Sequence, residues 1–524
     1  MKRVFPIHIF LIAWFFIVSP MMMFTRDIPP ALAARILFVS VPVNLALLGV
    51  LWLITRDLQH SAFVGMLLWI SLGLTSMPLL VGVPNWIISV TATWIVLLVL
   101  WALIAVLVLP RRVWRSVKDP SWVTRFLNII GACSISYSAF MMISTTIRLE
   151  EWKVRHAEWL AAKVPVQQAT TADSPDIYYI VLDGYGREDV LRERFGTENA
   201  EFLDPLTEMG FYIADEGRSN YSQTVLSMSS SLNLQYLDEQ IGMWGDGSGD
   251  RNPPTEMIHH SLARAFLEAR GYRMVNIFSG FYSTEIPDAD ERRGQDRPYG
   301  MNYYEQNLVL YSPLQEFLPK DQYGYPLLGY DAHRQRLVQG LESLAQLAAE
   351  SGPKFVFAHI LAGHPPFVLR EDGSSVEENR PFKLVDGDRS YDLREEYVSG
   401  YVAQIGYVNR RLLEIIPMIL RKGNRPAVII LQGDHGPGSA IDFFGTEGSC
   451  LWERTSILNA YYLPEEYRAG LYPSITPVNT FRLIFRNVFG ADFPPLKDMS
   501  FYSSWAKPYQ LRDIGDQITV SCPS

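Results

Sequence analysis

Two segments of the sequence place acidic side chains directly after short apolar runs. Asp183 follows residues 177–182 and precedes Gly184, and Asp434 with His435 follows residues 427–432. Carboxylate oxygen and imidazole nitrogen together suit Mn²⁺, Zn²⁺ or Mg²⁺. Taken singly, Asp183 is typical of a turn or helix cap, and Asp434-His435 fits a loop as well as a site. Their shared position at the ends of apolar runs favours a metal site.

A stretch rich in hydroxyl groups, residues 219–231, lies between these two segments. A hydroxyl needs activation before it acts as a nucleophile, and a metal ion activates it by lowering its pKa. The competing interpretation is a polar loop whose hydroxyls cap a helix. Composition alone favours this polar loop.

Four histidines stand in distinct contexts. His364 comes just after the apolar run 355–360, where it could bind an anionic oxygen or protonate a leaving group. His359 lies inside that run and is predicted to be a buried core histidine. His259 and His260 begin a helical pattern and are weak candidates for a site.

The elements that must position these residues alternate along the second part of the chain. Short apolar runs typical of buried strands occupy residues 177–182, 273–278, 355–360 and 427–432. Helical patterns lie near 197–209, 258–270, 331–350, 391–420 and 477–488. This alternation predicts an α/β domain with a mainly parallel sheet. Ligands of such sheets bind at the carboxyl ends of the strands, where the acidic residues stand.

The first part of the chain predicts about five transmembrane helices. Five apolar stretches are long enough to cross a hydrocarbon core of about 30 Å, which takes about 20 helical residues. They are residues 6–24, 36–54, 62–82, 86–109 and 126–144. Their apolar centres contain no Asp, Glu, Lys or Arg, which argues against a transport pathway.

The charges near the spans predict an orientation. Most Lys and Arg residues flank one set of span ends, and only Arg26 and Arg35 fall on the other side. The positive-inside rule then places the N-terminus in the cytoplasm and everything after Met142 outside it. A signal peptide ending at 31–33 is an alternative for the first span and leaves the later part outside as well.

Charge and cysteine content narrow the function further. Residues 1–125 carry ten Lys or Arg against three Asp or Glu, and the remainder carries 36 against 52. An acidic second part excludes general nucleic-acid binding, which needs a basic surface. Cys133 falls in the fifth span, so Cys450 and Cys522 remain outside, where they form either one disulfide or two free thiols. We predict a transmembrane domain at 1–145, a juxtamembrane helix and linker at 146–176, and an extracytoplasmic catalytic domain at 177–524.

The order of the motifs resembles a known family. LDG at 182–184, the hydroxyl segment, GHPPF at 363–367 and GDHG at 433–436 resemble the sulfatase-like branch of the alkaline phosphatase superfamily. Spans followed by an extracytoplasmic domain resemble lipoteichoic acid synthases and lipid A phosphoethanolamine transferases. The likeness covers roughly residues 175–490 by motif and the first 150 by topology.

The resemblance implies roles for particular residues. Thr224 fits the family spacing of a nucleophile followed three residues later by Ser227, and Ser229 is the alternative nucleophile. His364 matches a histidine on the substrate side, and Arg454 is a further contact for the substrate. The implied ligands of the metal ion are Asp183, Thr224, Asp434 and His435.

Departures from the family limit the implied chemistry. No cysteine begins the C/S-x-P-x-R motif that sulfatases convert to formylglycine, so sulfate-ester hydrolysis by that route is not expected. Ile360 stands where two-metal relatives have Asp, so one divalent ion (Mn, Zn or Mg) is implied.

The resemblance implies a transferase in the bacterial inner membrane, with several spans and an extracytoplasmic catalytic domain. Metal-bound Thr224 would take a phospho-headgroup from a lipid donor and pass it to an envelope acceptor. A phosphodiesterase or phosphatase that uses the same site, and a catalytically inactive membrane protein, remain as alternatives. The sequence does not indicate the donor, the acceptor or the oligomeric state.

Overall fold

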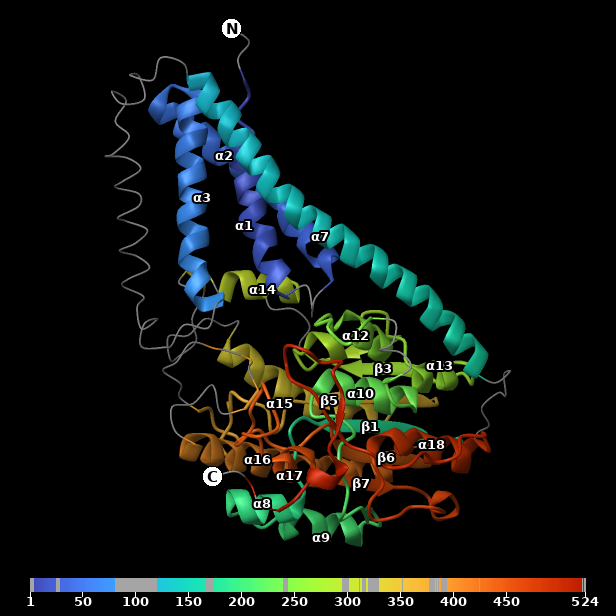
Figure 1. Cartoon of the computed structure of the whole chain (residues 1–524). Helices are drawn as coiled ribbons and strands as arrows, with labels where there is room; N and C mark the ends of the chain where they lie inside the picture. Colours follow the sequence, from blue (N-terminus) through green and yellow to red (C-terminus); the bar gives the residue numbers. More distant parts are fainter. Residues whose placement is uncertain are drawn as a thin grey trace. The chain divides into compact units, whose positions relative to one another are not determined.

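The computed structural model contains two compact units (Figure 1). The first comprises Met1–Glu151 and Arg297–Leu328, and the second comprises Trp152–Asp296 and Gly329–Ser524. The structure describes these residues: 4–24, 29–80, 120–164, 174–238, 244–294, 301–310, 312, 317–318, 329–350, 352–376, 382, 384, 386–387, 394–423, 425–520 and 522.

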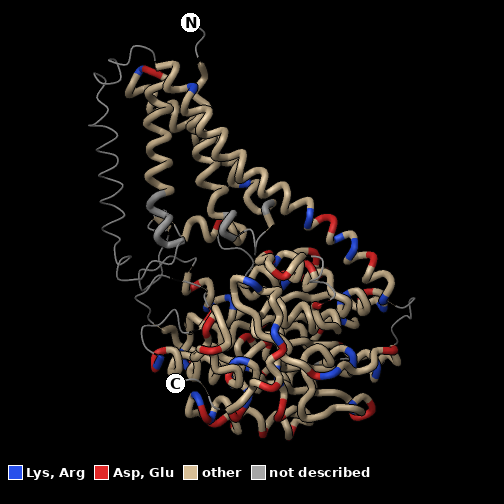
Figure 2. Tube along the Cα trace, in the orientation of Figure 1, with Lys and Arg blue, Asp and Glu red and all other residues tan. Residues whose placement is uncertain are grey.

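The described part of the first unit contains four long helices and two short ones. They are α1 (His8–Phe24), η1 (Pro30–Ala33), α2 (Ala34–Thr55), α3 (Leu58–Leu80), α14 (Tyr303–Leu310) and the first part of α7 (Pro120–Lys163). Helices α1 and α3 contain no Lys, Arg, Asp or Glu, and α2 contains only Arg35, in its first turn. Figure 2 accordingly shows these helices almost entirely without blue or red. Within the described residues, Ala31–Thr55 and Pro120–Lys163 are long and apolar enough to cross a membrane, and His8–Pro20 and Leu58–Gly73 are shorter apolar helices.

The predicted spans compare with these helices as follows. The stretches 6–24, 36–54, 62–82 and 126–144 fall largely on α1, α2, α3 and α7, and 86–109 lies outside the described residues. Only two of the helices meet the length and hydropathy expected of a span, so the number five stays a prediction.

Helix α14 comes from far along the sequence and packs within the first unit. Glu305 is buried and forms an ion pair with Arg35. The Asn302 side chain donates to the Leu32 carbonyl at 3.0 Å, and the Tyr304 hydroxyl donates to the Ile17 carbonyl. The insertion between β4 and α15 therefore contributes to the first unit.

The core of the second unit is a seven-stranded sheet in the order β2-β7-β6-β1-β5-β3-β4. Strands β6, β1, β5, β3 and β4 run parallel, and β7 and β2 are antiparallel additions at one edge. The strands are β1 (Asp176–Leu182), β2 (Tyr212–Ile213), β3 (Arg273–Ile277), β4 (Glu291–Arg293), β5 (Lys354–Ile360), β6 (Ala427–Gly433) and β7 (Asn459–Tyr462). The four apolar runs of the sequence are the four longest strands, each within one residue, which confirms the mainly parallel α/β domain.

Helices cover both faces of this sheet (Figure 1). One apolar cluster packs β1, β5 and β6 against α10 (Thr224–Asn233), α12 (Asn252–His259), α13 (Leu262–Glu268) and α18 (Pro477–Phe489). Helices α15 (Tyr330–Leu347) and α16 (Arg394–Lys422) pack together, and α15 also contacts β5. The remaining described elements are α8 (Glu188–Phe195), α9 (Ala200–Glu208), η2 (Tyr282–Thr284), α17 (Leu451–Thr455), η6 (Glu465–Tyr467), β8 (Phe501–Tyr502), β9 (Arg512–Asp513) and η7 (Gly515–Gln517).

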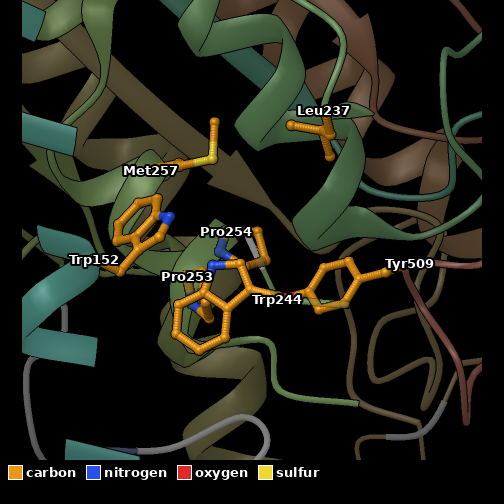
Figure 3. A pocket seen from close by; sticks show the side chains of 7 residues that line it. All are labelled: Trp152, Leu237, Trp244, Pro253, Pro254, Met257 and Tyr509. Carbon is orange, nitrogen blue, oxygen red and sulfur yellow. The ribbon is translucent and has the colours of Figure 1, made fainter. Parts of the chain in front are cut away.

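The last turns of α7 belong to the second unit and are held by Trp152. This indole is fully buried, stacks on the His156 ring and lies 6.4 Å from the Trp244 ring. Figure 3 shows both indoles with the apolar side chains around them, which enclose a space of only about 10 Å³. This contact is packing rather than a ligand pocket, because such a space is at most the size of one water molecule.

A disulfide joins Cys450 to Cys522, 72 positions apart in the sequence. The sequence left this pairing open, because separation along the chain says nothing about separation in space. Disulfides persist in oxidising compartments, so this bond is consistent with a domain outside the cytoplasm.

A buried ion pair at the amino ends of the strands supports a stability prediction. The Lys354 ammonium is fully buried and donates to Asp176 at 2.5 Å and to the Glu350 carbonyl at 3.0 Å. Lys354→Met leaves a buried carboxylate without its cation, so we expect a loss of about 3–5 kcal/mol in the free energy of unfolding. Thermal unfolding of the full-length protein in detergent measures it, and Lys354→Met/Asp176→Leu is expected to regain much of the loss. A double variant no more stable than the single one would contradict this account.

Candidate active site

The carboxyl ends of three neighbouring strands bring the predicted acidic residues together. Leu182 at the end of β1 pairs with Gly433 of β6 on one side and with Ile360 of β5 on the other. Asp183 and Asp434 are the residues that directly follow β1 and β6, so both lie at the same edge of the sheet. Gly184 takes a φ of 67° in the turn after Asp183, and its N–H donates to Asp434 Oδ1 at 3.1 Å. The two strand ends are therefore tied to each other.

Three buried side chains form a group that fits a metal ion. Ligand atoms of Asp183, His359 and Asp434 all lie within 4.8 Å of one another. Asp183 Oδ1 and Asp434 Oδ2 are buried and have no hydrogen-bond partner. A buried carboxylate oxygen without a partner is costly, so this arrangement calls for a cation. The donor set of carboxylates and imidazole therefore fits the divalent ion that the sequence implies.

His435 completes this group from the other side of Asp434. Its Nε2 lies 3.3 Å from Asp434 Oδ2 and 3.8 Å from Asp183 Oδ1. Its Nδ1 lies 2.9 Å from the Gly436 carbonyl, which fixes the proton on Nδ1 and leaves a lone pair on Nε2. Nε2 is thereby suited to bind a metal ion.

The two candidate nucleophiles occupy different surroundings. Thr224 is the first residue of α10, and its Oγ1 lies 3.0 Å from His435 Nε2. Ser229 is fully buried, and its hydroxyl donates to the Leu226 carbonyl of its own helix at 3.0 Å. Ser227 donates to the Asp434 carbonyl at 2.6 Å and so holds the loop after β6. Asp183, His359, Asp434 and His435 are called the metal-binding group below. Of the two hydroxyls, that of Thr224 lies beside this group.

Comparison with known proteins gives a consistent assignment. No curated protein sequence matches the chain. A family model described as Sulfatase matches residues 175–479, more than half of the chain. The chain belongs to the sulfatase family. This confirms the resemblance drawn from the motifs and identifies the protein as an enzyme acting on sulfate or phosphate esters.

Several solved structures are similar to this sulfatase-family protein at low identity. The C-terminal periplasmic domain of EcEptC from Escherichia coli is 11% identical with a TM-score of 0.41, covering 68% of this chain and 98% of that one. The integral membrane lipooligosaccharide phosphoethanolamine transferase A (EptA) from Neisseria meningitidis is 12% identical with a TM-score of 0.36, covering 90% and 94%. A putative sulfatase from Bacteroides thetaiotaomicron is 12% identical with a TM-score of 0.37, covering 64% and 74%.

His359 is the member of the sulfatase-family site that the motifs did not single out. The sequence predicts a buried core histidine, and the ring is indeed fully buried with partners for both nitrogens. Nδ1 lies 3.0 Å from Thr284 Oγ1, and Nε2 lies 3.1 Å from Asp183 Oδ2. Its position one residue before the end of a strand next to β1 is the available clue. His259 and His260, by contrast, lie outside the metal-binding group.

The two carboxyl groups of the sulfatase-family site have opposite pKa shifts. Burial raises the pKa of Asp183, but the imidazoles of His364, His359 and His435 outweigh it and hold this pKa below its usual value. Burial, and then repulsion from Asp183, raises the pKa of Asp434. Two neighbouring buried carboxylates resist being charged together, and a divalent cation removes that resistance.

Arg454 is buried and fully engaged by the protein. Its Nη2 lies 2.5 Å from Asp386 Oδ2, Nε donates to the Ser222 carbonyl at 2.9 Å, and Nη1 donates to the Gly436 carbonyl at 3.3 Å. Burial would raise the pKa of Asp386, but Arg454, His435 and His364 reverse the effect and lower it. The guanidinium therefore joins the segment before Thr224 to the loop after His435. Asp386, which the sequence gave no reason to select, holds Arg454 in place.

His364 lies on the loop after β5. Its Nδ1 donates to the Pro365 carbonyl at 2.6 Å, and its Nε2 makes no hydrogen bond to a described residue. The N–H of Gly363, the residue before His364, donates to the Asp183 carbonyl at 2.7 Å, so the loop that carries His364 lies beside Asp183. A ring with a free Nε2 there can donate a proton or bind an anionic oxygen.

Proposed function

We propose that this protein is a membrane-anchored, metal-dependent phosphotransferase that moves a phospho-headgroup from a lipid donor to an envelope acceptor through phospho-Thr224. One observation carries the proposal: Thr224 Oγ1 lies 3.0 Å from His435 Nε2, beside the unpartnered oxygens of Asp183 and Asp434. A nucleophilic hydroxyl next to a site that can hold an activating metal ion is the arrangement that covalent phosphoryl transfer needs. The first residue of α10 also experiences the partial positive charge of the helix N-terminus, which favours the alkoxide.

The residues that would hold the ion are Asp183, Thr224, Asp434 and His435, with His359 in contact with Asp183. When bound, Mn²⁺, Zn²⁺ or Mg²⁺ would lower the pKa of the Thr224 hydroxyl and offset charge on the phosphoryl oxygens. The mixed oxygen and nitrogen donors are compatible with each of these ions.

The proposed reaction has two displacements. The Thr224 hydroxyl gives its proton to water as Oγ1 forms a bond to the phosphorus of a lipid phosphodiester, and the bond from phosphorus to the lipid oxygen breaks. The leaving lipid alkoxide takes a proton from His364, whose Nε2 is free to supply it when protonated. An acceptor hydroxyl then gives its proton to His364 and attacks phosphorus, and the Thr224 oxygen leaves and takes a proton back from water.

The setting follows from the first unit and from the disulfide. Apolar helices in the first unit fit a membrane anchor, with the five spans of the sequence as the finer hypothesis. The positive-inside distribution and the Cys450–Cys522 bond both favour an extracytoplasmic domain on the bacterial inner membrane. An anchored active site meets its lipid donor at a high effective concentration.

The test is the intact mass of purified full-length protein incubated with Mn²⁺ and mixed bacterial phospholipids. We expect an added mass equal to a phospho-headgroup, located by fragmentation on the peptide that contains Thr224. An adduct on Ser229, or on any other residue, would contradict the proposal. Release of free headgroup phosphate without transfer to an added envelope acceptor would instead support the phosphodiesterase alternative, in which water resolves the same adduct.

A further inference from the structure

A second cavity in the sulfatase-family domain lies on segments outside the metal-binding group. Its volume is about 510 Å³, which is within the range of small-molecule sites. The loop after β1, the segment before α10 and residues 497–516 contribute to its walls, and none of Asp183, His359, Asp434 and His435 lines it. Met499 is the one large apolar side chain among its described lining residues. The cavity therefore suits a polar ligand and offers little to an acyl chain.

Two guanidinium groups face this cavity, and they differ in how they are paired. Arg187 is held by Asp189 through Nε at 2.8 Å and Nη2 at 2.6 Å, and it also donates to the Gly217 carbonyl. Arg218 is partly buried, and its guanidinium makes no hydrogen bond or ion pair with the described residues. Burial and then repulsion from Arg187 lower the pKa of Arg218, despite attraction from Glu216 and Asp189. A partly desolvated guanidinium without a partner is a ready site for a phosphate or carboxylate.

The other lining groups narrow the choice of anion. Lys497 adds a third cation, whereas Glu216, Asp513 and Asp516 are exposed carboxylates. The carboxylate of Asp498 is already used, since it accepts hydrogen bonds from the Thr476 N–H and hydroxyl and from Asn479. Asp513 Oδ1 already accepts the Gly515 N–H at 2.9 Å, which leaves Oδ2 for a ligand. The exposed carboxylates repel a polyanion but can accept hydrogen bonds from hydroxyl groups. A ligand with one anionic group and several hydroxyl groups can pair with the cationic side chains through its anion and with the carboxylates through its hydroxyl groups.

We propose that this cavity binds a phosphorylated sugar. The phosphate lies against Arg218 and Lys497, and the sugar hydroxyls donate to the carboxylates of Glu216 and Asp513. A cavity of about 510 Å³ exceeds the need of a free phosphate and accommodates the attached sugar. The site does not depend on the chemistry at Thr224, so it holds whether or not the protein is a transferase.

Two backbone hydrogen bonds connect the walls of the cavity to the segments that support the active site. The Ser219 N–H donates to the Thr455 carbonyl at 2.7 Å, and the Arg187 N–H donates to the Ser456 carbonyl at 3.2 Å. These bonds join the segment that leads to Thr224 with the segment that follows Arg454. A ligand held by Arg218 is therefore bound on the same two segments that support the active site.

The experiment is isothermal titration calorimetry on full-length protein in detergent, with metal removed by chelation so that the metal-binding group does not capture phosphate. The probes are glucose 1-phosphate, inorganic phosphate and glucose. We expect glucose 1-phosphate to bind more tightly than either other probe, and Arg218→Gln to weaken it about tenfold or more. Arg192→Gln is the matched control, because Arg192 is exposed on α8 and does not line the cavity. It is expected to bind like the wild type.

Lys497→Gln provides a second variant at an exposed position, so the test survives if Arg218→Gln does not fold. It is expected to weaken binding in the same direction. No binding by the wild type, or equal binding by the Arg218, Lys497 and Arg192 variants, would overturn the proposal. Equal affinity for inorganic phosphate and glucose 1-phosphate would overturn the sugar part, and equal affinity for glucose and glucose 1-phosphate would overturn the phosphate part.

Discussion

Replacing Thr224 by alanine is expected to slow turnover by about 10⁴-fold or more, the scale typical of removing a catalytic nucleophile. The methyl group of alanine leaves His435 Nε2 without the oxygen that lies 3.0 Å away. The covalent adduct is expected to disappear from the intact mass spectrum. Initial rates of headgroup release from phospholipid, measured with Mn²⁺ for the wild type and the variant, check the expectation.

Ser229→Ala is the matched control for this experiment. The Ser229 hydroxyl bonds to the Leu226 carbonyl within α10, so its removal changes a local bond and leaves the groups around Asp434 in place. We expect a rate close to that of the wild type and an unchanged adduct. A large loss of rate in Ser229→Ala together with a surviving adduct in Thr224→Ala would exchange the two roles.

Thr224→Ser separates the chemistry from the packing at the same position. Serine keeps the oxygen and loses only a methyl group, so we expect most of the activity lost in Thr224→Ala to return. A serine variant as slow as the alanine variant would show that the threonine methyl group, rather than the hydroxyl, is what the site requires.

The sequence predicts those features of the site that depend on strand ends. Asp183 and Asp434 each follow a continuous apolar run, and such runs form buried parallel strands whose carboxyl ends meet. His359 could not be distinguished in this way, because a histidine inside an apolar run looks the same whether its neighbour is a core residue or Asp183. The strand order β6-β1-β5 places His359 of β5 beside the end of β1, where Asp183 stands. Strand order depends on contacts between distant segments, which the sequence pattern does not give.

Asp386 and α14 show a second limit of sequence reasoning. Asp386 stands outside any helix or strand, so no periodicity marks it, and only its contact with the Arg454 side chain reveals its place. The pairing of Glu305 with Arg35 joins residues far apart in sequence, as does the disulfide between Cys450 and Cys522. Periodicity and motif order carry no information about such contacts. The predicted domain boundaries at 145 and 176 and the stretch 86–109 stay predictions.

Asp434→Asn is expected to remove divalent-ion binding while leaving the fold intact. The asparagine carbonyl can replace Asp434 Oδ1, which accepts the Gly184 N–H at 3.1 Å. Its amide NH₂ would replace Oδ2, the buried oxygen without a partner, and an amide nitrogen does not bind a cation. We expect metal affinity and turnover to fall by more than the roughly 10- to 100-fold typical of losing an outer partner of a metal ligand.

The stability of this variant gives a readout that does not depend on activity. An ion that binds only the folded state stabilises it by about 2.7 kcal/mol at about 100 times its Kd, so Mn²⁺ or Zn²⁺ is expected to raise the unfolding temperature of the wild type. Asp434→Asn should lack this increase. Without metal, however, the variant is expected to be at least as stable as the wild type, because it removes one of two buried carboxylates that repel each other.

Thermal unfolding with added ion and with chelator, together with metal content measured on the purified proteins, checks both expectations. Equal stabilisation of the wild type and the variant by metal would place the ion elsewhere. A metal-free variant much less stable than the metal-free wild type would show that Asp434 serves the fold. The proposed function instead requires a site whose carboxylates destabilise the empty protein and are stabilised by the ion that they bind.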